Sequence, residues 1–336
     1  GGQGLPYTVA TAVEEMIGSA CMAFSLCPML TRGAIELISV HGTEAQKETY
    51  LGKLIAGEWS GTMNLTEPQA GSDVGAVRSK ALPEGDHFRI KGTKIFITYG
   101  EHDLAENIVH LVLARLPEAP PGTRGISCFI VPKFLVNADG SPGARNDLRC
   151  VSLEHKLGIH ASPTAVMSFG DNEGAIGYLV GPENGGMRCM FTMMNAARMA
   201  VGQEGLSIGE RAYQQALGYA CERIQGRPLG ADEGAAIVEH PDVRRQLMTI
   251  KCQVEAARAL QLFTAQSVDI SRHHPETQVR EQNADLVDLL TPVIKGWITD
   301  MGVEVTSMAL QVHGGMGFIE ETGAAQHYRD ARIAPI

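Results

Sequence analysis

The sequence lacks the features that mark a secreted, metal-binding or membrane-spanning chain. Its 7 cysteines are scattered, and no two form a Cys-x-x-Cys pair, which argues against a zinc site and a disulfide framework. No apolar run approaches the roughly 20 residues that a membrane helix needs. The 28 basic residues are outnumbered by 38 acidic ones, and the net charge of −10 disfavours nonspecific nucleic-acid binding. We therefore expect a cytoplasmic protein with reduced thiols, no metal site, no membrane span and no nucleic-acid partner.

Two common nucleotide-binding signatures are also absent. No Gly-x-Gly-x-x-Gly follows a strand and opens a helix, and no Gly-x-x-x-x-Gly-Lys-Ser/Thr occurs, so Rossmann and phosphate-loop folds lose their main support. The first residue is not Met, and both ends read as interior sequence, so we expect a fragment of a longer protein. With 44% hydrophobic residues in 336, the chain is nevertheless able to bury a sizeable core over about two domains.

Hydrophobic periodicity divides the chain into three parts. Apolar residues recur at helical spacing from Thr8 to about Ala56, and again after Gly186. Between Thr62 and Val180, short runs rich in Ile, Val and Phe are punctuated by Gly, Pro and Asp, which predicts a compact antiparallel β domain. The predicted fold is α+β and multidomain: an N-terminal helical part at 1–60, a middle antiparallel β domain at 61–182, and a C-terminal four-helix-type bundle at 183–336 that is incomplete at its end.

Several local signals refine this prediction. Thr43 is a plausible N-cap, Pro241 suits a first helical position, and Pro292 should kink or split the longest helix. Helical spacing predicts a further helix from about Asn195 to Ile224. The stretch 137–146, rich in Gly, Pro and Asx residues, predicts a surface loop.

Three segments carry residue types suited to a flat, phosphorylated cofactor. In Met63–Asp73, a glycine, a serine hydroxyl and free amides suit an anion such as a pyrophosphate. In Lys94–Thr98, an aromatic ring could cover a flat ring system while a threonine donates to a ring nitrogen. In Gln311–Phe318, three glycines exceed what a helix C-cap requires. Each segment also has an ordinary structural explanation, namely a turn, a cross-strand core pair and a helix end.

The order of these segments resembles the acyl-CoA dehydrogenase family. The resemblance rests on Thr-Glu-Pro-x-Ala-Gly-Ser-Asp at 66–73, Phe-Ile-Thr at 96–98, Glu-Arg-x-Gln at 222–225, Gln-x-x-Gly-Gly-x-Gly at 311–317 and Arg-Asp-Ala-Arg-Ile at 329–333. It covers the chain from about residue 10 to its end. The stretches 101–107, 116–122 and 137–146 are similar to those of the larger bacterial members.

The resemblance implies that the protein is a flavoprotein oxidoreductase of fatty acid metabolism that binds FAD and acyl-CoA. The residues expected to contact FAD are Met63, Leu65, Thr66, Gly71, Ser72, Phe96, Ile97, Thr98, Arg223, Gln225, Gln311, Gly314 and Gly315. Those expected to contact acyl-CoA are Ser72, Ser162, Asn195 and Arg198. In the family, the segments at 223–225 and 311–315 reach the FAD of a neighbouring subunit. We therefore expect a homodimer or tetramer whose monomer holds FAD poorly, although Gln225 stands before Gly226 where many members have an aromatic residue.

The family reaction is α,β-dehydrogenation of an acyl-CoA thioester to the enoyl-CoA, with electrons passed to an electron-transfer flavoprotein. By resemblance, the catalytic Glu belongs two residues beyond Ile336, and the alternative position on the helix holds Ala197. Glu320 and Glu321 belong to a loop and carry little weight. We expect no catalytic base in this chain, which should be inactive as written.

Other functions stay open at this stage. An acyl-CoA oxidase would pass electrons to oxygen and is not distinguished by these residues. A non-enzymatic flavin-binding relative and a helical scaffold without a cofactor are further alternatives. The acyl chain length and the choice between dimer and tetramer are not determined by the sequence.

Overall fold

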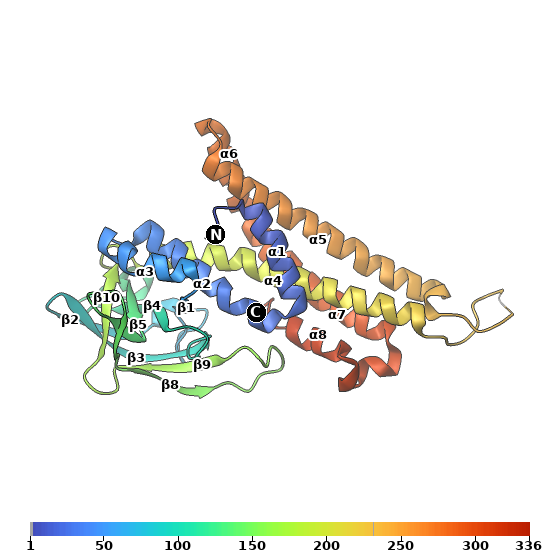
Figure 1. The fold of residues 1–336 in the computed structure, drawn as a ribbon, viewed down its shortest axis with the longest axis horizontal. Helices are drawn as coiled ribbons and strands as arrows, with labels where there is room; N and C mark the ends of the chain where they lie inside the picture. The colour runs from blue at the N-terminus through green and yellow to red at the C-terminus, as the bar shows by residue number, and fades with distance from the viewer. Residues whose placement is uncertain (1–2, 231) are drawn as a thin grey trace.

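The computed structural model describes residues 3–230 and 232–336, and helices precede and follow a β-rich middle part. In Figure 1 the strands lie at one end of an elongated molecule and the long helices extend away from them. The first helices are α1 (Tyr7–Ala20), α2 (Met22–His41) and α3 (Glu44–Ala56). The strands are β1 (Trp59–Asn64), β2 (Lys80–Glu84), β3 (His87–Thr98), β4 (Asn107–Arg115), β5 (Ile126–Pro132), β6 (Phe134–Val136), β7 (Pro142–Arg145), β8 (Leu148–Leu153), β9 (Thr164–Phe169) and β10 (Ala175–Val180). The later helices are α4 (Gly186–Glu222), α5 (Pro241–His273), α6 (Thr277–Val293), α7 (Thr299–Val312) and α8 (Ala324–Ala331).

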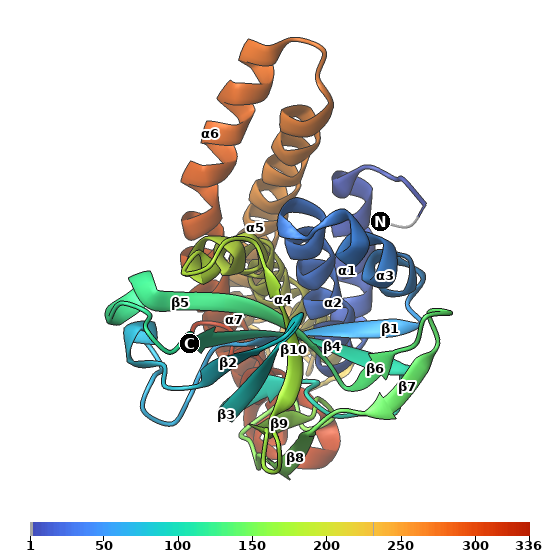
Figure 2. The same ribbon diagram turned by 90° about the vertical axis from the view of Figure 1, so that its left-hand side faces the viewer.

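The main sheet has the strand order β1-β4-β5-β10-β3-β9-β8, with β2 beside β3, and it fans out in Figure 2. The prediction of an antiparallel β domain is confirmed for most pairs, but β1 runs parallel to β4. The intervening strands β2 and β3 supply the long crossover that a parallel pair needs. The apolar runs at 88–90 and 94–98 lie in one continuous strand, β3.

The prediction of a surface loop at 137–146 is partly wrong. Strands β6 and β7 form a small antiparallel hairpin in which Phe134 faces Arg145. The Arg145 guanidinium lies over the Phe134 ring, 5.5 Å from its centroid. This cation–π contact and the pairing of β6 with β7 stabilise the hairpin, although the composition of the stretch is typical of a loop.

Helix caps match the sequence signals. Thr43 caps α3 through a capping box, in which its side chain accepts from the Gln46 amide while the Gln46 side chain accepts from the Thr43 amide. Pro241 occupies the first turn of α5. Helix α2 is long and apolar enough to cross a membrane by length and composition alone, at a mean hydropathy of 1.3. Our expectation that no run reaches that length was wrong for α2, and 44% of the most apolar 18-residue window of this helix is buried inside the protein.

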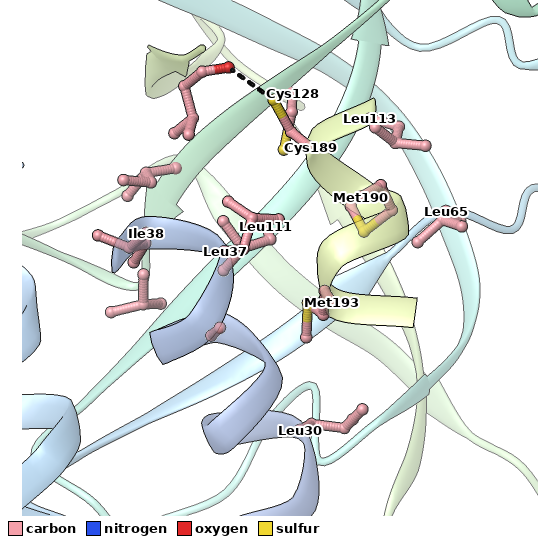
Figure 3. Packing of buried hydrophobic residues seen from close by; sticks show 14 of the residues in the cluster. Leu30, Leu37, Ile38, Leu65, Leu111, Leu113, Cys128, Cys189, Met190 and Met193 are labelled. Atoms are coloured by element: carbon pink, nitrogen blue, oxygen red, sulfur yellow. Dashed lines mark hydrogen bonds between the residues drawn. The ribbon is translucent and has the colours of Figure 1, made fainter. Parts of the chain in front are cut away.

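A hydrophobic core joins α2 and α4 to the sheet. Figure 3 shows Leu37 of α2 and Met193 of α4 beside Leu111 of β4, and all three side chains are buried. The Cys189 thiol donates to the carbonyl of Val180, at 3.7 Å. These contacts fix the N-terminal half of α4 on the β domain.

The bundle is built around α4, which begins at Gly186 rather than at the predicted Asn195. The methionine-rich stretch before Asn195 is therefore helical, and Met190 and Met193 are core residues. The predicted break at Pro292 is confirmed, because a π-helical turn, Ile294–Ile298, separates α6 from α7. Such turns often accompany functional sites.

Glycines allow α4 and α7 to approach closely. A Cβ atom built on Gly205 would lie 2.5 Å from the Ile298 carbonyl oxygen, and one on Gly302 would lie 2.9 Å from the Gly205 carbonyl oxygen. By contrast, a Cβ on Gly218 of the same helix meets no atom within 4 Å.

Gly205→Ala should destabilise the protein by about 1–3 kcal/mol, because the added methyl group forces the two helices apart. Gly218→Ala is the matched control and should be neutral or stabilising by up to about 1 kcal/mol, since Ala favours the helix. Urea unfolding followed by circular dichroism measures both. Equal effects of the two substitutions would show that the close helix contact does not limit stability.

Candidate active site

A buried ion pair joins two of the segments that the sequence singled out. The Lys94 ammonium of β3 lies 2.8 Å from Glu67 Oε1 and also donates to the Leu65 carbonyl. Both charged side chains are buried. The Ile95 amide donates to the Thr66 carbonyl at 2.9 Å, so the Thr-Glu-Pro turn is tied to β3 by side chains and backbone together.

Glu67 is held as a carboxylate. Burial opposes its ionisation, but the Lys94 ammonium and the donors from Ser79 and the Arg78 amide outweigh burial and lower the pKa of Glu67 to about 2. Each of these donors lies within 3.1 Å of a Glu67 oxygen. Because the Glu67 carboxylate has this many charged and polar partners, it holds the Thr-Glu-Pro turn in a fixed position relative to β3.

The end of β3 turns outward Phe96, one of the residues predicted to cover the flavin. A bulge between Lys94 and Ile97 interrupts pairing with β9, and Phe96 adopts a positive φ of 60°. As a result the Phe96 ring is 59% exposed while Ile97 is buried. A non-glycine residue with positive φ costs free energy that surrounding contacts must offset, and such residues cluster at functional sites.

The segment 63–73 contains both core and open residues. The Leu65 side chain is buried in the core that includes Met190 and Met193, so its side chain packs within the protein. Gly71 and Ser72 are exposed. A Cβ atom on Gly71 would meet no atom within 4 Å, so no other part of the protein covers the backbone of the turn at this residue.

A cavity of about 310 Å³ brings the end of β3 together with the end of the chain. Its wall includes Phe96 and Thr98 from the β domain and Arg332 and Ile336 from the C-terminal segment. The Arg-Asp-Ala-Arg-Ile motif is thereby placed opposite the Phe-Ile-Thr motif, although more than half of the chain separates them in sequence.

Asp330 holds the two parts of this cavity together. Its carboxylate accepts from the Ile159 amide at 2.5 Å. A Cβ on Gly158 would lie 2.6 Å from the Arg329 backbone, so the loop before β9 packs directly on α8. The sequence contained both segments but no signal that they meet.

The predicted acyl-CoA residues lie in different surroundings. Ser162 is fully buried and its hydroxyl has no hydrogen-bond partner in the described part of the chain. Arg198 donates to Asn195 at 3.2 Å and lies over the Phe191 ring. The substrate roles of these residues and of Ser72 stay predictions.

The remaining predicted cofactor residues gather at the other end of the bundle. His313, between Gln311 and Gly314, stacks on Tyr219 with ring centroids 4.6 Å apart, which places the end of α7 beside the end of α4. The Gln225 carbonyl is hydrogen-bonded to His240 at 2.9 Å. In Figure 1 this region lies at the opposite end of the molecule from the sheet. One chain therefore does not bring Arg223, Gln225, Gln311, Gly314 and Gly315 to the cavity at Phe96.

Glu204 is a buried carboxyl that the sequence analysis missed. It lies on α4 and lines an apolar cavity of about 340 Å³ between α1, α2 and α4, with Met29 and Ser207 nearby. Its Oε1 has no hydrogen-bond partner among the described residues. Burial raises the pKa of Glu204 to about 8, against the opposing charge of Lys295. The only sequence signal for the burial of Glu204 is its position on the inward face of a helix.

The fold and these motifs define an FAD-dependent oxidoreductase family that acts on acyl-CoA: the chain belongs to the acyl-CoA dehydrogenase family. Family models match its N-terminal domain at residues 1–58, its middle domain at 62–172 and its C-terminal domain at 184–336. FAD is the cofactor of this family.

Among its relatives, the 3-methylmercaptopropionyl-CoA dehydrogenase of Ruegeria pomeroyi is 57% identical over all of this chain and 57% of the relative. A butyryl-CoA dehydrogenase of Syntrophomonas wolfei is 43% identical over 98% of this chain and 55% of the relative. The chain thus spans somewhat more than half the length of these relatives.

Solved structures show the same fold. The butyryl-CoA dehydrogenase from Megasphaera elsdenii superposes with a TM-score of 0.78 at 27% identity, over 97% of this chain and 76% of the other. The structure described as "Electron transferring flavoprotein of Acidaminococcus fermentans: Towards a mechanism of flavin-based electron bifurcation" superposes with a TM-score of 0.81 at 26% identity, over 99% of this chain and 79% of the other.

Lys94→Met should destabilise the protein by about 3–5 kcal/mol, because it leaves the Glu67 carboxylate buried without its cation. The double variant Glu67→Gln with Lys94→Met should lose less than the sum of the single losses. Lys91→Met, at an exposed position of the same strand, is the control. Urea unfolding of wild type, Lys94→Met, Glu67→Gln, the double variant and Lys91→Met measures these losses. A Lys94→Met loss no larger than that of Lys91→Met would show that the ion pair does not hold the turn on β3.

Glu204→Gln should stabilise the protein increasingly as pH rises from 4.5 to 8. The folded pKa of Glu204 is raised from 4.5 to about 8, so in this window the unfolded chain releases a proton that the native state retains, and wild-type stability falls with rising pH. Each pKa unit is worth about 1.4 kcal/mol, so the gain should reach a few kcal/mol at pH 8.

Urea unfolding at pH 5 and pH 8 tests this dependence. Glu222→Gln, at the exposed end of the same helix, should show a difference from wild type that does not grow over the window. A Glu204→Gln difference that is equally flat would mean that Glu204 ionises freely in the native state.

Proposed function

We propose that the protein to which this chain belongs catalyses FAD-dependent α,β-dehydrogenation of an acyl-CoA thioester to the enoyl-CoA. The observation that carries the proposal is the cavity in which Phe96 and Thr98 face the C-terminal segment. The relatives named for 3-methylmercaptopropionyl-CoA and butyryl-CoA support acyl-CoA as the substrate class.

The residues at the cavity fit FAD. The exposed Phe96 ring would cover one face of the flavin, and the Thr98 hydroxyl would donate to its N5 atom. The open turn at Gly71 and Ser72 would bind the pyrophosphate through backbone amides and a hydroxyl. FAD, when bound, supplies the acceptor for the hydride that leaves the β carbon.

We propose that the base that removes the α proton is a Glu two residues beyond Ile336. The Ile336 side chain lines the cavity, which supports a place near this cavity for the residue proposed as base. Three positions within the chain lack support as the base: Ala197 has no titratable group, Glu320 is paired with Arg329 at 2.7 Å, and Glu204 lines the other cavity. On this proposal the chain by itself is inactive.

We propose that the second group of cofactor residues binds the FAD of a neighbouring subunit. Tyr99, next to Thr98, shares a buried cluster with Ile208 of α4, and Arg223 lies 15 residues further on, about 22 Å along the helix. A second copy of the chain in a homodimer or tetramer would supply these residues to the cavity. The cytoplasmic location and the electron-transfer flavoprotein as acceptor also stay proposals. The similarity to a structure described as an electron transferring flavoprotein supports the choice of acceptor.

The decisive experiment is anaerobic addition of butyryl-CoA or 3-methylmercaptopropionyl-CoA to the FAD-loaded protein that includes the natural continuation of the chain. Wild type should lose its flavin absorption. Thr98→Val should slow this reduction about tenfold or more, because it removes one hydrogen bond to the flavin. Thr93→Val, exposed on the same strand, should react like wild type.

Two results would count against the proposal. Wild-type flavin that neither acyl-CoA reduces would contradict dehydrogenation. Rapid peroxide formation in air after reduction would favour the acyl-CoA oxidase alternative over transfer to a flavoprotein.

A further inference from the structure

The loop between β8 and β9 contains a backbone conformation that is unfavourable for its residue. Ile159 has a positive φ of 45°, and β-branched residues rarely adopt this region. Its side chain is buried in a cluster with Tyr99 and Ala331. A residue in this region costs free energy that the surrounding structure must offset. The loop therefore keeps its conformation only while other groups hold it.

Asp330 of α8 is the group that holds Ile159. The Asp330 side chain is buried, and its carboxylate accepts from the Ile159 amide at 2.5 Å. Its second oxygen accepts from the Gln326 side chain at 3.3 Å. A Cβ atom on Gly158 would lie 2.6 Å from the Arg329 carbonyl oxygen, so the loop lies directly against α8. Because a hydrogen bond to a carboxylate is stronger than one between neutral groups, Asp330 offsets the strain at Ile159.

Hydrogen bonds connect Ile159 to the end of β3. The Ile159 carbonyl accepts from the Ser162 amide at 2.9 Å. The carbonyl of the next residue, Pro163, accepts from the Tyr99 amide at 2.8 Å. Thr98, directly before Tyr99, pairs with the first residue of β9. The position of the loop and the position of the Thr98 backbone are therefore coupled.

We propose that Asp330 is a positioning residue, which sets the position of the Thr98 hydroxyl by holding the loop before β9. The inference rests on the proposed function, because Thr98 is the residue proposed to donate to the flavin. Gly158 and Ile159 line the same cavity as Thr98, whereas Asp330 lies behind them and acts through the loop. A displacement of about 1 Å is enough to cost a large factor in rate.

The first test uses the chain without a cofactor. Asp330→Ala removes the acceptor of the Ile159 amide, so hydrogen exchange at the amides of Ser162 and Tyr99 should accelerate about tenfold. Asp330→Asn keeps an oxygen that accepts from the amide, and exchange should stay within about twofold of wild type. If Asp330→Ala does not fold, Asp330→Glu replaces it, because Glu moves the acceptor by one methylene group. Exchange at the same two amides should then accelerate at least about threefold.

Asp147→Ala is the matched control for the exchange experiment. The Asp147 carboxylate also holds a turn of the β domain, because it accepts from the amides of Asn172 and Gly174 at 3.0 and 2.9 Å. This turn follows β9, whereas the loop held by Asp330 precedes it. The control should therefore leave exchange at the two amides unchanged.

The second test uses the FAD-loaded protein to which the chain belongs, with butyryl-CoA as the probe. Asp330→Ala should slow flavin reduction about tenfold, with butyryl-CoA affinity within about twofold of wild type, and Asp330→Asn should restore the rate. Asp330→Ala combined with Thr98→Val should be at most about twofold slower than Thr98→Val alone, because both changes disturb the same contact. A residue that only stabilised the fold would give losses that multiply.

Two results would overturn the role of Asp330. Unchanged exchange and an unchanged rate in Asp330→Ala would show that the loop keeps its position without the carboxylate. Losses that multiply when Asp330→Ala and Thr98→Val are combined would show that Asp330 does not act through Thr98.

A failure of the proposed function gives a different result. Wild-type flavin that butyryl-CoA and 3-methylmercaptopropionyl-CoA both fail to reduce would remove that function and, with it, the role of Asp330 toward the flavin. The exchange experiment separates the two cases, because it measures the hold of Asp330 on the loop without FAD or acyl-CoA.

Discussion

The buried ion pair between Lys94 and Glu67 determines how the two segments of the β domain that are predicted to bind the cofactor lie relative to each other. Glu67 stands in the Thr-Glu-Pro turn and Lys94 stands two residues before Phe96, so their 2.8 Å contact fixes the turn against the bulge that exposes the Phe96 ring. A buried pair adds little net stability compared with apolar packing, yet it penalises any arrangement that separates the charges. The pair therefore contributes geometry, and the open faces of Phe96 and the 71–72 turn depend on it.

Helix α4 is the second element on which the site depends. Its first turns pack on the sheet with α2, its middle meets the π-helical turn at Gly202 and Gly205, and its end stacks on His313 through Tyr219. Because α4 is closely packed along its length, it holds the elements at its two ends at a fixed separation. It separates the cavity at Phe96 from the loop at Arg223, which supports the proposal that two chains together form the cofactor site.

Much of the local structure was predictable from residues near one another in the chain. The Thr43 cap, the start of α5 at Pro241 and the break after Pro292 each depend on contacts within one or two turns. Other predictions were wrong where distant contacts decide. The hairpin of β6 and β7 forms in a stretch with loop composition, and α4 extends past Asn195 toward the sheet because Met190 and Met193 pack in the core.

By itself, the sequence determined the three-part organisation, because local hydrophobic periodicity distinguishes helices from strands. It also determined the family, because the linear order of the motifs identifies the acyl-CoA dehydrogenases. Only the tertiary structure decided which charged groups meet. Lys94 and Glu67 are 27 residues apart, Lys295 and Ala334 are 39 apart, and Ile159 and Asp330 are 171 apart. The burial of Glu204, which raises its pKa to about 8, likewise follows from three helices closing around it. Such pairings and burials depend on how the elements pack, and no local pattern encodes that packing.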